Sequence, residues 1–152
     1  MRQLEFIATS TAITGYDDSA LAKSETRDCV VRAIASSSGM AYDKAHALVA
    51  EKFNRKFREG TYFFTSTMNR MAASGEKLNR KSVKSVDVTV KNKTGLTKMT
   101  VNKFVENFNK GSYVVCVKGH AFTIKDGKVV GNREDALKIK KKLIGAWKIG
   151  TR

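Results

Sequence analysis

Residues 28–53, DCVVRAIASSSGMAYDKAHALVAEKF, carry the helical pattern from which the fold is predicted. A helix is predicted to begin at Cys29, because apolar residues recur at helical spacing after it, and to end at Gly39. Asp28 stands where an N-cap residue is expected. A second helix with an apolar stripe is predicted over residues 42–53, and it is expected to pack on the first.

Strand patterns dominate the second half of the chain. A short capped helix is predicted to end at Gly75, and a third clear helix is predicted to begin at Thr100 and to end at Gly111. Strands are predicted for LEFIAT (4–9), VDVTV (86–90), YVVCV (113–117), AFTI (121–124), KVV (128–130) and LIGAWKI (143–149), and KNKTG (91–95) resembles a turn. Helices followed by an antiparallel sheet predict an α+β fold, in a single domain over residues 1–152.

Composition limits the cellular setting. No run approaches the roughly 18 apolar residues that cross a bilayer, and the N-terminus lacks a long apolar segment after its early Arg. We therefore expect a cytoplasmic protein. The two cysteines, Cys29 and Cys116, are expected to be reduced thiols, because two residues cannot build a disulfide framework.

The chain is strongly basic, with 29 Lys and Arg against 14 Asp and Glu and a net charge of +15. Such an excess favours an anionic partner, and we expect an acidic protein or a nucleic acid rather than a membrane. Aromatic residues Tyr62, Phe63 and Trp147 are candidates for stacking on bases. The candidate anion-binding residues come from three basic runs: Arg55, Lys56, Arg58, Arg80, Lys81, Lys140, Lys141 and Lys142.

Cys29 and His120 are the candidate reactive pair. The first turn of a helix lowers the pKa of a thiol through its free N–H groups and its dipole. Of the two histidines, His46 lies inside the second helix, whereas His120 stands beside a glycine where two strands meet. The imidazole needs a third group to orient it. The hairpin that follows returns Asn132 toward His120, whereas the rival Asp126 lies at the distal turn.

Residues 28–53 resemble the nucleophile helix and following helix of papain-like cysteine peptidases, especially small phage-encoded ones. TVNKFVENFNKGSYVVCVKGHAFTIKDGKVVGN, residues 100–132, is similar to the second half of that fold. The resemblance implies N-terminal helices packed on a C-terminal antiparallel sheet, with a cysteine nucleophile, a histidine base and an orienting residue in that order. It assigns these roles to Cys29, His120 and Asn132.

The sequence departs from the family at the oxyanion position. Papain-like peptidases carry a Gln five or six residues before the nucleophile, where this chain has Lys23 and Ser24. Those two residues and the backbone N–H of Cys29 are the candidate donors, and the sole glutamine, Gln3, is remote in sequence. Such a donor is worth roughly 3–4 kcal/mol of transition-state stabilisation.

Two functions follow from these patterns. The first is a thiol hydrolase of peptide or isopeptide bonds, with an acidic protein or a host protein as its substrate. The alternative is a weakly active or inactive papain-like fold whose basic surface binds nucleic acid or a host protein. A structural protein without a site is a third reading. No cofactor is expected, and the spacing of His and Cys matches no metal-binding motif.

Overall fold

The computed structural model describes residues 4–131, 133–137 and 140–150. Seven helices lie within these ranges: α1 (Thr9–Ala12), α2 (Ala20–Ser24), α3 (Cys29–Ser38), α4 (Tyr42–Lys52), α5 (Phe64–Ser74), α6 (Val101–Asn107) and α7 (Arg133–Ala136). The strands are β1 (Phe6–Ala8), β2 (Val83–Val86), β3 (Thr89–Asn92), β4 (Gly95–Lys98), β5 (Ser112–Val117), β6 (His120–Lys125), β7 (Lys128–Gly131) and β8 (Gly145–Ile149). The predicted α+β class is therefore observed.

Six of these strands form one mixed sheet in the order β1-β7-β6-β5-β8-β2. All neighbouring pairs are antiparallel except β1 and β7, which run parallel with Phe6 opposite Val129. The C-terminal strands β5, β6, β7 and β8 thus pair antiparallel as expected, and the sheet is mixed because the N-terminal β1 joins it in parallel. The N-terminal strand covers the edge of β7 that would otherwise expose its backbone hydrogen-bonding groups.

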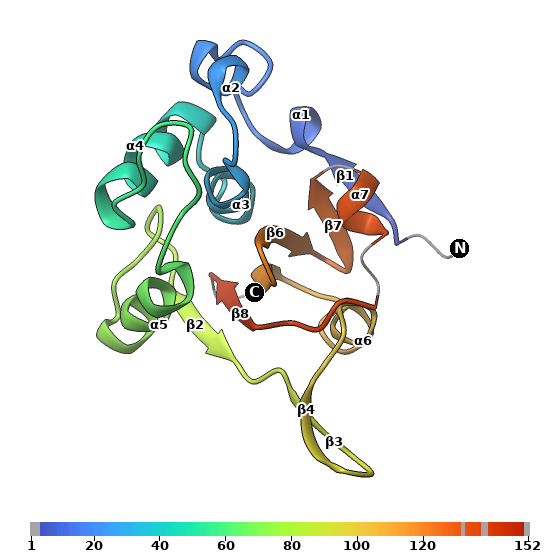
Figure 1. Cartoon of the computed structure of the whole chain (residues 1–152). Coiled ribbons are helices and arrows are strands. Elements are labelled where there is room, and N and C mark those ends of the chain that lie inside the picture. The colour runs from blue at the N-terminus through green and yellow to red at the C-terminus, as the bar shows by residue number, and fades with distance from the viewer. Residues whose placement is uncertain (1–3, 132, 138–139, 151–152) are drawn as a thin grey trace.

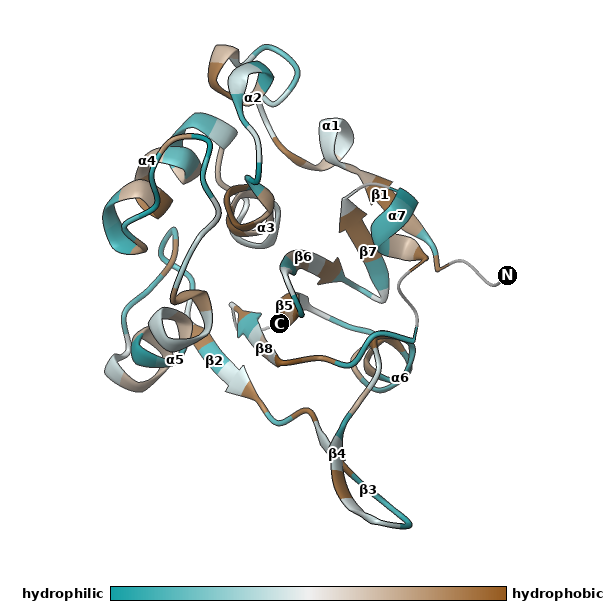
Figure 2. Ribbon diagram, in the orientation of Figure 1, coloured by the Kyte–Doolittle hydropathy of each residue, from teal (hydrophilic) through white to brown (hydrophobic). Residues whose placement is uncertain are grey.

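The two faces of this sheet support two apolar cores, because strand residues alternate between faces. One core lies between the sheet and helices α3, α4 and α5, with Val114, Ala121 and Trp147 facing those helices. The other core, on the opposite face, joins Val115 and Phe122 to helix α6 and its neighbours. Figure 2 shows apolar residues gathered on α3 and on the strands β6 and β7. Helix α3 thus lies in the interior, against β6 (Figure 1).

A buried chain of hydroxyl groups fixes α3 on the sheet. Ser36 donates to the Thr123 hydroxyl at 2.7 Å, and Thr123 donates to the carbonyl of Ala33 at 2.9 Å. The hydroxyl of Ser112 on β5 donates to the carbonyl of Ser37 at 2.8 Å. Buried hydroxyl groups need such partners, so the polar SSS run at the end of this helix sets its position relative to β5 and β6.

Most of the predicted helix boundaries agree with the structure, although α6 ends at Asn107, before the predicted end at Gly111. Gly39 and Gly75 end α3 and α5 in the left-handed conformation, at φ 75° and 77°. Thr100 caps α6 by accepting a hydrogen bond from the N–H of Lys103. Asp28 occupies the N-cap position of α3, but its side chain makes no capping bond.

One predicted strand is divided in the structure. The run VDVTV was expected as a single strand, but β2 ends at Val86 and β3 begins at Thr89. Strands β3 and β4 instead pair with each other in a separate two-stranded sheet, and the expected turn over KNKTG connects them. Within the described ranges, no helix combines the length and apolarity that crossing a membrane requires.

Candidate active site

Cys29 is the first residue of α3, and its side chain is half-buried. The carboxylate of Asp28 does not cap the helix because it accepts hydrogen bonds from the Tyr42 hydroxyl at 2.7 Å and from Arg32 Nε at 3.2 Å. The side chain of the N-cap residue therefore leaves the N–H groups of the first helical turn free of a capping bond. These groups and the helix dipole favour negative charge at this position.

His120 meets Cys29 from the sheet. It is the first residue of β6 and pairs with Val117 of β5, at the end of the antiparallel ladder. Cys29, His120 and Ala121 line the same groove, and the His120 ring and the backbone N–H of Ala121 lie close enough to the thiol to lower its pKa. The ring of His120 stacks on Phe122 with centroids 5.7 Å apart. The structure thus brings together the two residues that the sequence analysis paired.

Asp135 on α7 is the third member of this arrangement, and the sequence analysis missed it. Its Oδ1 atom lies 2.7 Å from Nε2 of His120, and its side chain is 2% exposed. Because Nε2 faces this carboxylate, Nδ1 is the ring nitrogen left for Cys29. Asn132, the predicted orienting residue, lies outside the described residues. Asp126 accepts a hydrogen bond from the N–H of Gly111 at the distal turn, as its sequence position predicts.

The three groups shift one another's ionisation. The hydrogen bond to Asp135 and that to Cys29 raise the pKa of His120 to about 9, although burial opposes this. Burial alone would raise the pKa of Cys29, but the hydrogen bond with His120 and that from Ala121 outweigh it and lower that pKa. The two shifts act in the same sense, because each favours the charged form of its group: the thiolate of Cys29 and the imidazolium of His120.

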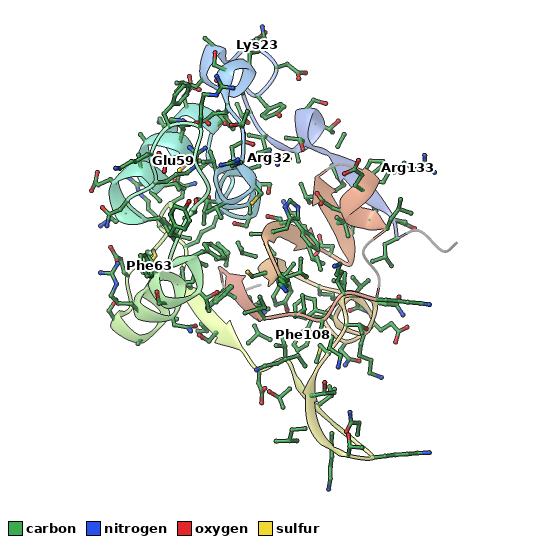
Figure 3. All side chains as sticks on the ribbon, viewed as in Figure 1. Lys23, Arg32, Glu59, Phe63, Phe108 and Arg133 are labelled. Atoms are coloured by element: carbon green, nitrogen blue, oxygen red, sulfur yellow. The ribbon has the colours of Figure 1, made fainter. Side chains whose placement is uncertain are left out.

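The pair opens onto a groove with a volume of about 860 Å³. Helix α3 and the segment before it form one wall, which includes Arg27 and Arg32. Residues 60–66 form the opposite wall, with Tyr62 66% exposed and Phe63 82% exposed. Figure 3 shows Arg32 on α3 and Phe63 at the start of α5. The groove therefore combines a reactive thiol with cationic and apolar surface.

A buried ion cluster connects the two walls. The Glu25 side chain is fully buried and receives two hydrogen bonds of 2.8 Å from the Arg55 guanidinium and one from the N–H of Arg58 at 3.0 Å. His46 lies against the same carboxylate. Burial would raise the pKa of Glu25, but the bonds from Arg55 and His46 lower it to about 2. The segment before Cys29 is thereby fixed to the loop that leads into residues 60–66.

This cluster changes the interpretation of one predicted anion-binding residue. Arg55 is buried, and its guanidinium is already held by Glu25 and by the carbonyl of Thr26 at 3.0 Å. It therefore stabilises the loop and is not part of the exposed basic surface. Glu25 and Arg55 are thirty residues apart, and neither lies in an apolar run, so the sequence pattern gave no signal of their burial.

The other candidate anion-binding residues are all exposed: Lys56, Arg58, Arg80, Lys81, Lys140, Lys141 and Lys142. They do not converge on the groove beside Cys29. Lys81 also donates to the carbonyl of Ser38 at 2.9 Å, at the C-terminus of α3.

The candidate oxyanion donors differ in position. Lys23 and Ser24 belong to α2, are exposed and do not line the groove. Figure 3 shows Lys23 on the outlying α2. Gln3 lies outside the described residues. The backbone N–H of Cys29, at the head of α3, is the candidate that the local geometry places beside the thiol.

Cys116 lies in the same groove as Cys29. Burial raises its pKa, so it is the less reactive thiol of the two. Among the described residues, no three His, Cys, Asp or Glu side chains form a group that could hold a metal ion. Comparison of the chain with protein-family models, with curated proteins and with solved structures gave no match.

Proposed function

We propose that this protein is a cysteine hydrolase with a papain-like arrangement, which cleaves peptide or isopeptide bonds through Cys29, His120 and Asp135. The observation that carries the proposal is that Cys29 and His120 line one groove, while the buried carboxylate of Asp135 is hydrogen-bonded to His120. A nucleophile hydrogen-bonded to a base, which a third group orients in turn, is the general pattern of covalent catalysis.

The reaction follows from this geometry. The thiolate of Cys29 attacks the carbonyl carbon, and the oxygen that becomes negative is stabilised by the N–H of Cys29 at the head of the helix. The imidazolium of His120 donates its proton to the leaving amine, which gives a thioester. His120 then takes a proton from water as the water attacks the thioester, and the Cys29 thiolate is released. Asp135 keeps the ring oriented through both steps.

The groove supports a class of substrate. Arg27 and Arg32 provide positive charge on one wall, and Tyr62, Phe63 and Ile144 provide exposed apolar surface. A peptide that carries an acidic residue and a large apolar residue close to the scissile bond fits this combination. The net charge of +15 favours the approach of an acidic protein as well.

A peptide probe that carries a thiol-reactive warhead tests the proposal. Wild-type protein should be labelled at one thiol, and Cys29→Ala should abolish the labelling without lowering the melting temperature. Cys116→Ala is the matched control, because it removes a thiol from the same groove but should leave labelling intact. Equal labelling of wild type and Cys29→Ala would exclude Cys29 as the nucleophile.

A further inference from the structure

The β3–β4 hairpin is the most isolated element of the fold. Its strands, Thr89–Asn92 and Gly95–Lys98, pair only with each other in a separate sheet. Figure 1 shows the hairpin extending away from the helices and from the main sheet. At its base, Val90 packs partly against the second core, whereas Leu96 is 76% exposed. A projecting two-stranded ribbon of this kind contributes little to the cores and is available for binding.

Charge on the hairpin is of one sign. Residues 88–98, VTVKNKTGLTK, contain three lysines and no acidic residue. All three lysines are exposed: Lys91, Lys93 and Lys98. The register places Lys91 opposite Leu96 and Lys98 opposite Thr89, so one face of the ribbon presents lysines together with an apolar side chain.

A second lysine cluster adjoins the hairpin. The ammonium group of Lys142 donates to the Thr97 hydroxyl at 2.8 Å, and Lys142 also forms an isolated bridge with Thr100. Lys140 and Lys141 precede it, and both are exposed. Thr97 alternates with Leu96 and Lys98 along β4, so Lys142 lies by the other face of the hairpin. Lysines are therefore present on both sides of the hairpin and beside it, and we call these six the lysine ribbon: Lys91, Lys93, Lys98, Lys140, Lys141 and Lys142.

The shape and composition of the lysine ribbon favour one class of anionic partner over the others. We propose that it binds double-stranded DNA, with its lysines on the phosphates and the hairpin in a groove. A two-stranded ribbon fits the major groove of B-form DNA, whereas the deep and narrow major groove of an RNA duplex excludes it. Residues 88–98 contain no aromatic side chain, which single-stranded nucleic acid requires for base stacking. Leu96 supplies an apolar contact for thymine methyl groups or for a base step.

This site is separate from the proposed hydrolase site. None of the six lysines lines the groove of Cys29 and His120. DNA binding is therefore a further activity, and its tests do not depend on catalysis.

Fluorescence anisotropy with a labelled 20-base-pair duplex tests the proposal. The triple variant Lys91→Gln, Lys93→Gln, Lys98→Gln should bind at least tenfold more weakly than wild type at low salt. Its plot of log affinity against log salt should be shallower by about 3, because three phosphate contacts are lost. Leu96→Ser should weaken binding while leaving the salt slope unchanged.

The matched control is Lys23→Gln, Lys44→Gln, Lys56→Gln, which removes the same charge from exposed lysines on or beside helices α2 and α4. It should bind nearly as well as wild type, and both triple variants should keep the wild-type melting temperature as a check of folding. Equal losses in the two triple variants would overturn the proposal in favour of net charge alone. Unlabelled poly-glutamate and single-stranded DNA should compete less well than the unlabelled duplex. Equal competition by either of them would overturn the proposal in favour of another partner.

Discussion

The carboxylate of Asp135 lies against Gly131, in the space that a β-carbon at residue 131 would occupy. Gly131 is the last residue of β7, so the strand approaches α7 closely enough for the carboxylate to reach His120. A glycine is required here because any side chain would overlap the Oδ2 atom of Asp135.

Gly131→Ala should therefore impair the proposed catalysis, although it replaces none of the three residues Cys29, His120 and Asp135. The new methyl group would displace the carboxylate of Asp135 from His120, and we expect a fall in kcat/KM comparable to that of Asp135→Asn. Turnover of a fluorogenic peptide measures this. Gly95→Ala is the control, because a β-carbon there meets no atom within 4 Å. Wild-type turnover in Gly131→Ala would show that the carboxylate position does not matter.

Asp135→Asn should move the alkaline limb of the activity profile. In the proposed reaction the imidazolium of His120 acts as the acid, so activity should be lost as the pH rises through about 9, the raised pKa of His120. Without the Asp135 charge this limb should shift to lower pH, and kcat/KM should fall by roughly 10²-fold. A pH series of kcat/KM measures both effects. A loss of rate with an unmoved limb would indicate a purely structural role for Asp135.

Glu25→Gln should lower the free energy of unfolding at neutral pH, and it should make that free energy less dependent on pH in the acidic range. The folded-state pKa of Glu25, about 2, lies below its ordinary value of 4.5, so its contribution is complete above about pH 4.5 and is lost as the pH falls toward 2. Breaking a buried ion pair on one side typically costs about 3–5 kcal/mol. Urea unfolding at pH 7 and pH 3 should show a smaller difference in the variant than in wild type.

Glu76→Gln is the matched control for that experiment. Glu76 pairs with Lys52 at 2.7 Å, but both side chains are substantially exposed, so little change in stability is expected. Similar losses in the two variants would contradict a special role for the Glu25 cluster in fixing the groove walls.

Phe63→Gly should separate stability from substrate binding. Phe63 is exposed on the groove wall with φ 58°, a left-handed conformation that disfavours side chains with a β-carbon. Glycine relieves this strain, so the melting temperature should stay the same or rise, whereas KM should rise because the apolar contact is lost. Phe63→Ala keeps the backbone strain, so it should raise KM as Phe63→Gly does but should not raise the melting temperature. An unchanged KM in both variants would remove Phe63 from substrate binding.

Periodicity predicted the elements that depend on local pattern. The helix at Cys29 and the hairpin from His120 follow from apolar spacing and from glycines. The pairing of the thiol with the imidazole came from the small number of histidines and from the family resemblance. Asp135 was missed because its role depends on how α7 packs against β7. The only local signal was an acidic residue three positions after Asn132.

Burial of charge was the other feature that local pattern did not reveal. Glu25 and Arg55 look like surface residues in the sequence, and only the tertiary fold brings them together. The parallel pairing of β1 with β7 depends likewise on contacts between the two ends of the chain. Asp87 and Val88 interrupt the alternating run VDVTV because the chain leaves the main sheet there to form the hairpin.

The thiol and the imidazole belong to opposite halves of the polypeptide, and each depends on the other for its ionisation. A nascent chain that has emerged from the ribosome only as far as α5 carries Cys29 but neither His120 nor Asp135. That fragment lacks His120 and Ala121, the two residues whose hydrogen bonds lower the pKa of the thiol in the folded chain. The proposed reactivity of the thiol therefore depends on α3, β6 and α7 being packed together, and it cannot precede the folding of all three elements.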